Sequence, residues 1–254
     1  MAETFLRRRA PELFGVAAVA ASVLVFEALI RGGVVNRYII PPPSDIFLAF
    51  ERVIVEEHIL ARCRDTAVEM IIAGGASVLV GVPVGALLYR SALCRRAMED
   101  WIGALAAAPI VLAFPLFLVL FGRSPKTIIV MGFVHGLAPI ILKTVEGLAS
   151  TRPVLINVGR SLKMTQSQMF WKILFPSALP VIFTGIRLSW TFVLITIVGI
   201  EYLINLGGLG QLINELAERY DLPGTYAGIC FVVLVSVLFF VILERVEAWL
   251  QPGR

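Results

Sequence analysis

The sequence predicts an all-α integral membrane protein with six transmembrane helices, and its composition and the spacing of its apolar runs support this prediction. Of the 254 residues, 58% are hydrophobic and 16% are charged, against roughly 45–50% and about 25% in soluble domains. The mean hydropathy is +0.88. Apolar runs of about 20 residues, the length that crosses a bilayer, recur between polar segments. This composition excludes a soluble enzyme, a disordered chain and a nucleic-acid-binding protein.

The predicted spans belong to a single transmembrane domain, residues 1–254. They cover approximately residues 13–30, 66–89, 101–121, 127–148, 177–204 and 225–243. The first run resembles a signal peptide near Ala18-Val19-Ala20. However, it continues for ten further apolar residues, which favours an uncleaved anchor. After it, Ser44 is predicted to cap an interfacial helix over residues 45–55.

Small residues and prolines modify the spans. Ser77, Gly81 and Gly85 recur every four residues in the second span, a pattern that lets another helix approach closely. Prolines interrupt the third and fourth spans, and we expect them to bend these helices so that they line a cavity. These prolines are Pro109, Pro115 and Pro139.

The distribution of Lys and Arg predicts the orientation. With the N-terminus in the cytoplasm, more of these residues fall on the cytoplasmic side than on the outer side, as the positive-inside rule requires. We therefore expect both termini to be cytoplasmic. The net charge of +4 reflects this asymmetry and does not indicate a phosphate-binding face.

A polar segment, residues 149–172, separates the fourth and fifth spans. Leu155, Val158 and Leu162 repeat at three- and four-residue spacing, which predicts a short amphipathic helix. Thr165 followed by Gln168 is typical of a capping box that starts a second helix. Such a segment is either a helix lying on the membrane surface or a docking element for a cytoplasmic partner.

Residues 150–187 (STRPVLINVGRSLKMTQSQMFWKILFPSALPVIFTGIR) decide between these interpretations. They resemble the cytoplasmic docking loop of ABC-importer permeases of the binding-protein-dependent class. That loop reads Glu-Ala-Ala, three residues, Gly, nine residues, Ile, one residue, Leu-Pro. Here Ile173 and Pro176 fall in register. The resemblance narrows to the nitrate/sulfonate/taurine-type subfamily through the segments 38–44, 108–122 and 143–148, and through Glu201 before Gly207-Gly208-Leu209-Gly210.

The loop also departs from the family pattern. Asn157, Val158 and Gly159 replace Glu-Ala-Ala, and Lys163 replaces the glycine. A non-glycine residue there needs an unfavourable backbone conformation unless the turn has a different shape. Loss of the acidic residue removes one polar contact to an ATPase subunit.

The resemblance implies two sets of functional residues. The docking set for the ATPase is Leu155, Asn157, Val158, Gly159, Arg160, Leu162, Lys163, Thr165, Ile173 and Pro176. In the family, spans three to five of two copies line the translocation path. The candidates here are Phe114, Phe117, His135, Trp190, Thr191 and Glu201.

The resemblance further implies a non-catalytic permease subunit in the bacterial inner membrane. Its partners would be two ATP-binding subunits, a second permease copy and a periplasmic or lipid-anchored solute-binding protein. A homodimer is expected, with a heterodimer as the alternative. No G-x-x-x-x-G-K-[ST] motif occurs in the sequence, so ATP and Mg²⁺ would be bound by the partner and no cofactor by this chain.

The predicted cargo is a small solute, a sulfonate such as taurine, nitrate or a related small organic anion. A heteroaromatic vitamin precursor is an alternative, as is an ATP-independent secondary transporter. A membrane-embedded enzyme would need His135 with Glu69 or Glu201, and no spacing in the sequence brings these residues together. The three cysteines and two histidines lie far apart without metal-binding spacing, so no metal site is expected.

Overall fold

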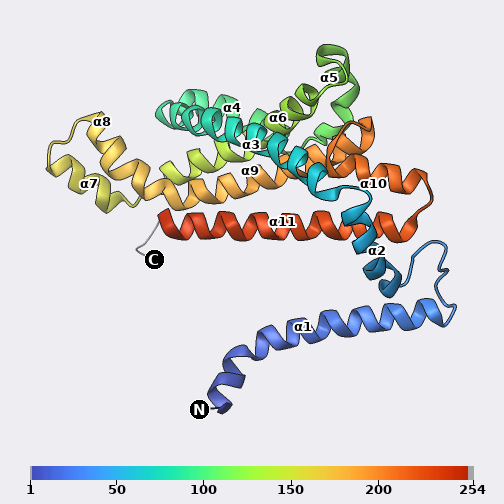
Figure 1. The fold of residues 1–254 in the computed structure, drawn as a ribbon. Coiled ribbons are helices and arrows are strands. Elements are labelled where there is room, and N and C mark those ends of the chain that lie inside the picture. The colour runs from blue at the N-terminus through green and yellow to red at the C-terminus, as the bar shows by residue number, and fades with distance from the viewer. Residues whose placement is uncertain (1, 251–254) are drawn as a thin grey trace. The chain divides into compact units, whose positions relative to one another are not determined.

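The computed structural model describes the backbone of residues 2–250 and the side chains of residues 14, 15 and 17–248. All regular elements in this part are helical (Figure 1). They are α1 (Ala2–Arg31), α2 (Pro43–Val55), α3 (Ile59–Arg90), α4 (Ala92–Ala107), η1 (Ile110–Ala113), α5 (Phe114–Phe121), α6 (Pro125–Ala149), α7 (Pro153–Ser161), α8 (Gln166–Met169), η2 (Phe170–Leu174), α9 (Phe175–Ile204), α10 (Gly208–Glu218) and α11 (Leu222–Leu250).

Four helices in the described part are long and apolar enough to cross a membrane. They are α3, α6, the continuous helix that runs from α8 through α9, and α11. A fifth span results if the bent pair formed by α4 and by η1 with α5 is counted as one. Residues 13–30, the predicted first span, lie within α1, and the side chains of residues 13 and 16 are outside the described part.

The chain forms two compact units, Met1–Leu60 with Leu212–Val233 and Ala61–Gln211 with Leu234–Arg254. In the first unit, α2 begins at Pro43 and not after a Ser44 cap. The predicted cap is therefore wrong, because proline at the first helical position already suits the helix start. Ser44 instead bonds through its backbone N–H and its hydroxyl to the Glu27 carboxylate, at 3.1 and 2.8 Å.

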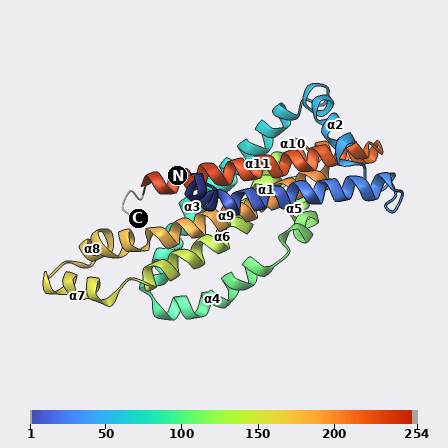
Figure 2. The ribbon, with the colours of Figure 1, turned by 90° about the horizontal axis from the view of Figure 1, so that it is seen from below.

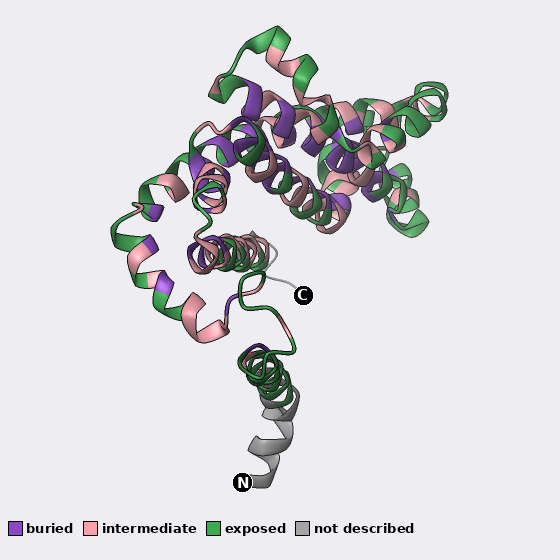
Figure 3. Cartoon of the chain, turned by 90° about the vertical axis from the view of Figure 1, so that its right-hand side faces the viewer, coloured by how far each residue is buried: buried purple, intermediate pink, exposed green. Residues whose placement is uncertain are grey.

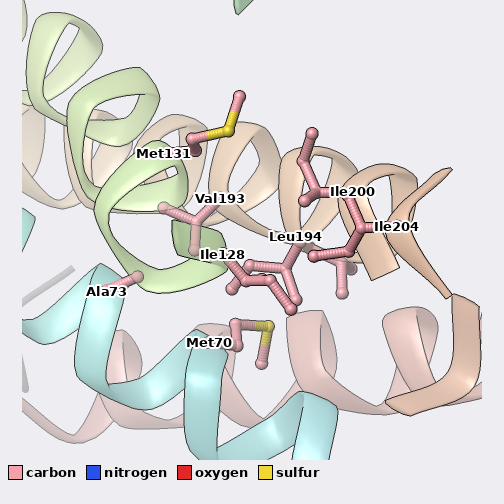
Figure 4. Close-up of a cluster of buried hydrophobic side chains, with 9 residues drawn as sticks. Met70, Ala73, Ile128, Met131, Val193, Leu194, Ile200 and Ile204 are labelled. Carbon is pink, nitrogen blue, oxygen red and sulfur yellow. The ribbon is translucent and has the colours of Figure 1, made fainter. Parts of the chain in front are cut away.

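The second unit is built around α6. This helix and α9 lie side by side along much of their length (Figures 1 and 2), and most of the described buried residues of the unit lie on these two helices or on α3 (Figure 3). One core cluster joins all three helices (Figure 4). Its members are Met70 and Ala73 of α3, Ile128 and Met131 of α6, and Val193, Leu194, Ile197, Ile200 and Ile204 of α9.

The predicted third span, 101–121, is not one helix. The structure ends α4 at Ala107 and bends the chain by 86° before η1 and α5. Ala108 is extended, with φ −68° and ψ 133°, because the ring of the following Pro109 disfavours a helical backbone at the residue before it. Proline was expected to bend this span, and the bend is large enough to break it.

Two further segments adjoin α9. The glycine-rich segment after it, residues 207–210, leads into the start of α10. Between α8 and α9 the helix widens into a π-helical stretch, Phe170–Leu174. Pro176 lacks an N–H, and its ring would meet the carbonyl four residues earlier, which accounts for a widened turn at this place.

Candidate functional site

The segment between α6 and α9 forms the helix–turn–helix that the sequence predicts. In Figure 2, α7 and α8 lie beyond one end of α6 and α9. Thr165 accepts a hydrogen bond from the Gln168 N–H at 3.2 Å, and the Gln168 side chain accepts one from the Thr165 N–H at 3.0 Å. The predicted capping box is therefore confirmed.

One face of α7 is apolar and exposed. Leu155, Val158 and Leu162 expose 41%, 50% and 64% of their surfaces, and Val154 beside them exposes 69%. Because α7 lies outside the long apolar helices, these side chains are available to a partner. This stripe is the part of the docking set that the structure presents most openly.

The side of α7 next to this apolar face packs against the second helix. A Cβ added at Gly159 would lie 2.6 Å from Met169 Cε and 2.7 Å from Ile173 Cδ1. Glycine therefore stands where the family pattern has alanine because Met169 and Ile173 fill the space that a methyl group would need. Asn157, Arg160 and Lys163 are exposed, and so are Thr165 and Pro176.

The turn after α7 explains the glycine of the family pattern. The Met164 N–H donates to the Gly159 carbonyl and the Lys163 N–H to the Arg160 carbonyl, at 3.1 and 2.9 Å. This pair of bonds is a Schellman motif, whose penultimate position requires a left-handed backbone and usually holds glycine. Lys163 has φ 52°, so the unfavourable conformation expected from the sequence is present.

Of the candidate residues of the translocation path, three lie against the core and Thr191 bonds within its own helix. Phe114, Phe117 and Trp190 pack against the core cluster of α3, α6 and α9, and the Trp190 ring stacks on Phe239 with centroids 5.0 Å apart. The Trp190 indole N–H is buried without a hydrogen-bond partner in the described part. Thr191 is half-buried and donates to the Arg187 carbonyl at 2.9 Å.

His135 is buried and takes part in a hydrogen bond. Its Nδ1 lies 2.6 Å from Thr196 Oγ1, which donates its own proton to the Phe192 carbonyl at 2.9 Å. Since the hydroxyl proton is already used, Nδ1 must carry the hydrogen and act as donor. The ring also lies edge-on to Phe192, with centroids 4.7 Å apart.

Glu201 is fully buried at the end of α9, and it holds the first turn of α10. Its two carboxylate oxygens accept hydrogen bonds from the Thr66 hydroxyl at 2.7 Å and the Gly210 N–H at 2.8 Å. Thr66 also accepts from the Leu209 N–H at 2.9 Å. Two otherwise unpaired N–H groups of a helix start are thus satisfied, and a carboxylate is favourable at that end of the helix dipole.

The glycines near Glu201 are needed for this close approach. A Cβ at Gly208 would lie 2.0 Å from Glu201 Oε1, and one at Gly210 would lie 2.2 Å from the Val198 carbonyl oxygen. Gly208 also has φ 70°. The glycine-rich sequence after Glu201 therefore serves to bring α10 onto the carboxylate.

Sequence reasoning missed the partners of Glu201. Glu69 of α3 exposes only 9% of its surface and lies close to the Glu201 carboxyl group. Arg187 of α9 pairs with Glu247 of α11 at 2.5 Å. Both pairings join residues on different helices, and periodicity within one helix carries no signal for them.

Charged groups also organise the first unit. Arg52 of α2 forms an ion pair with Asp221, and this hydrogen bond raises the pKa of the Arg52 guanidinium above its ordinary value. Arg219 donates to Glu57 at 2.8 Å. These contacts connect α2 with the turn between α10 and α11.

The fold, a bundle of long apolar helices with a helix–turn–helix segment between α6 and α9, is that of a multi-pass membrane protein. Residues 77–253 match the family described as binding-protein-dependent transport system inner membrane component, and the chain belongs to that family. It is the non-catalytic transmembrane component of an ABC importer.

Relatives and solved structures agree with this assignment. The chain is 25% identical to the formylaminopyrimidine transport permease protein ThiX of Halalkalibacterium halodurans, over 84% of this chain and 85% of that one. It is 24% identical to the taurine transport system permease protein TauC of Escherichia coli, over 86% and 81%. The inward-facing MetNI methionine ABC transporter has a similar fold, with TM-score 0.65, 21% identity, and coverage of 74% of this chain and 94% of that chain.

Proposed function

We propose that the chain crosses the bacterial inner membrane six times, with both termini in the cytoplasm, and that residues 149–172 form its docking element for an ATP-binding subunit. In this arrangement α1 provides the first span and the bent pair of α4 and α5 provides the third. The single observation that carries the proposal is the exposed apolar face formed by Leu155, Val158 and Leu162.

The working complex contains two copies of this chain and two ATP-binding subunits, and a solute-binding protein delivers the cargo to the outer face. ATP and Mg²⁺ belong to the ATP-binding subunits. Closure of these subunits on ATP moves α7, and because α7 packs against Met169 and Ile173, the movement passes directly into the helix that continues as α9. The cavity then opens outward, and hydrolysis returns it to the inward-open state.

We infer that the cargo is a small solute, a sulfonate such as taurine, nitrate or a related organic anion. The names of the relatives support this range and extend it, because taurine, nitrate, aliphatic sulfonates and formylaminopyrimidine all occur among them. An osmoprotectant permease is also similar, at 30% identity over 71% of this chain and 86% of that chain. Direct binding measurements on the cognate binding protein would select one cargo from this range.

Charge placed on the apolar face of α7 tests the docking role. In Leu155→Asp and Leu162→Asp, a carboxylate replaces an apolar contact that docking would bury without a partner, a loss that costs several kcal/mol. We expect ATP-driven uptake to fall at least about tenfold while insertion into the membrane is unchanged. Uptake into reconstituted vesicles and co-purification of the ATP-binding subunit are the two measurements.

Ser161→Asp is the matched control. Ser161 is exposed on the same helix, outside the apolar face, and the substitution adds the same charge. We expect nearly normal uptake in this variant. Normal uptake in both leucine variants would contradict the docking role of α7.

A further inference from the structure

A hollow of about 830 Å³ lies between α7 and α8 on one side and the end of α3 on the other. Its lining residues are Tyr89, Arg90, Ile156, Arg160, Met164, Gln166, Ser167, Met169, Phe170 and Leu174. The volume is within the range of small-ligand sites in proteins. All of these residues belong to one compact unit of the chain, so the hollow is a feature of that unit.

The hollow has a strong cationic character. Arg90 and Arg160 contribute two guanidinium groups, and no acidic residue is among the lining residues. The chain between Glu146 and Glu201 contains no Asp or Glu at all. Neither arginine forms an ion pair with a carboxylate in the described part, and Arg90 lies over the Phe170 ring, 5.4 Å from its centroid.

Apart from Gln166, Ser167 and the Tyr89 hydroxyl, the remaining lining residues are apolar, and several of them lie at the ends of membrane helices. Phe170 and Leu174 are at the start of the long helix that continues as α9, and Tyr89 is in the last turn of α3. The Trp171 side chain beside them is 61% exposed, as is typical of the aromatic belt at a membrane surface. The hollow thus combines two cations with an apolar wall at the predicted cytoplasmic boundary of the membrane.

We propose that this hollow binds the headgroup of an anionic phospholipid, with its phosphate between Arg90 and Arg160 and its acyl chains along Met169 and Leu174. Basic pockets beside transmembrane helices on the cytoplasmic side are suited to such headgroups. An amphipathic ligand matches both halves of the lining, whereas a free anion would use only the arginines. The bound lipid sets the resting position of α7 relative to the end of α3.

The site is separate from the exposed apolar face of α7, and Arg160, which the resemblance placed in the docking set, belongs here to the lipid site. Ile156 and Arg160 are four residues apart and share one side of α7, and Gly159 beside them packs inward on Met169. Leu155, Val158 and Leu162 lie about 150° around the helix axis from them, at 100° per residue. Lipid and ATP-binding subunit would therefore occupy different sides of the same short helix.

Lipid titration of the purified full-length chain in mild detergent, followed by native mass spectrometry, tests the site. The probes are phosphatidylglycerol, phosphatidylcholine with the same acyl chains, and inorganic phosphate. We expect preferential binding of phosphatidylglycerol, and a drop of about tenfold or more in its affinity in the double variant Arg90→Gln/Arg160→Gln, because each cation near an anionic lipid contributes to binding. The control Arg95→Gln/Arg96→Gln removes equal charge from α4 and should retain the wild-type affinity.

Three results would overturn the proposal. The first is equal phosphatidylglycerol affinity in the Arg90/Arg160 variant and the wild type. The second is complete competition by inorganic phosphate, which would identify a free-anion site. The third is an Arg90/Arg160 variant that binds the lipid as the wild type does but no longer co-purifies with the ATP-binding subunit. That result would assign the two arginines to a protein contact. If the double variant does not fold, photo-cross-linking of a photoactivatable phosphatidylglycerol to the wild-type protein is the deciding experiment. Adducts on Met164, Met169 or Phe170 support the site, and adducts confined to other segments contradict it.

Discussion

Lys163 occupies a left-handed backbone conformation, φ 52°, in the turn that joins α7 to α8. For a residue with a Cβ this conformation costs roughly 1–2 kcal/mol. The Schellman hydrogen bonds from Lys163 and Met164 to α7 hold it in place. The segment between α6 and α9 therefore contains a strained position where the family pattern has glycine, and the strain is a property of one residue.

Replacing Lys163 by glycine should relieve that strain. Because glycine also loses more conformational freedom on folding, we expect a net stabilisation of about 1 kcal/mol or less in Lys163→Gly. Lys163→Ala removes the same side chain but keeps a Cβ, so its stability should match the wild type. Thermal unfolding in detergent compares the variants, and equal midpoints for glycine and alanine would show that the turn carries no strain.

Glu201 shows how a single buried carboxylate can organise an element. It satisfies the start of α10 through Gly210 directly and through Thr66 indirectly. A glutamine at this position keeps one acceptor oxygen but turns an amide N–H₂ toward a donor. We expect Glu201→Gln to lower the free energy of unfolding by about 1–3 kcal/mol, the cost of an unsatisfied buried polar group.

Glu218→Gln is the control for this prediction. Glu218 is exposed at the other end of α10 and bonds only Asn214 in the described part, so its replacement should change stability by less than about 0.5 kcal/mol. Thermal unfolding in detergent again provides the comparison. An equal, small effect of both substitutions would mean that Glu201 does not hold α10.

At the scale of elements, the close contact of α3 with α6 depends on small residues. A Cβ at Gly81 would lie 2.2 Å from Ile140 Cγ2, and one at Gly85 would lie 2.9 Å from the Ile141 carbonyl oxygen. Ser77 Oγ lies 3.1 Å from the Phe133 carbonyl oxygen. The four-residue spacing in the sequence predicted this contact, and the structure confirms it.

Gly85→Ala should therefore destabilise the bundle. The added methyl group meets backbone and not only a movable side chain, and overpacking of this kind costs about 1–3 kcal/mol. Gly75→Ala is the matched control, because no atom lies within 4 Å of its Cβ position. Thermal unfolding should show a lower midpoint for Gly85→Ala alone, and equal midpoints would contradict the assigned α3–α6 contact.

The sequence predicts the position of some helices more accurately than that of others. Hydropathy locates both ends of α6 and α9 within two residues, since bilayer thickness fixes the length of an apolar helix. The predicted spans begin seven residues after the start of α3 and end seven residues before the end of α11. Local patterns likewise predict α7 and the capping box that starts α8. The break after Ala107 was expected only as a bend, because the sequence places Pro109 but the angle depends on what α5 packs against.

The candidate site was less predictable for the same reason. The stripe on α7 follows from spacing along one helix. By contrast, the contacts of Glu69 and Thr66 with Glu201 arise where two helices far apart in sequence meet, and a single sequence does not state which helices meet. The partner of His135, the Thr196 hydroxyl, likewise lies on another helix.

At the scale of the whole molecule, the chain has the organisation of a subunit and not of a self-contained carrier. Its family, its fold and its non-catalytic role are those of the membrane component of an ABC importer. The segment between α6 and α9 carries an exposed apolar face, for which we propose an ATP-binding subunit as the partner. The central claim is that this face holds an ATP-binding subunit.

Purification of the tagged full-length chain from its native membrane in mild detergent, with mass spectrometry of the proteins that accompany it, tests this claim most directly. We predict that an ATPase with a phosphate-binding loop co-purifies in about equal amount and is lost in Leu155→Asp. Recovery of the chain without an ATPase, together with solute transport in liposomes that needs no ATP, would contradict the account and leave α7 as a helix on the membrane surface.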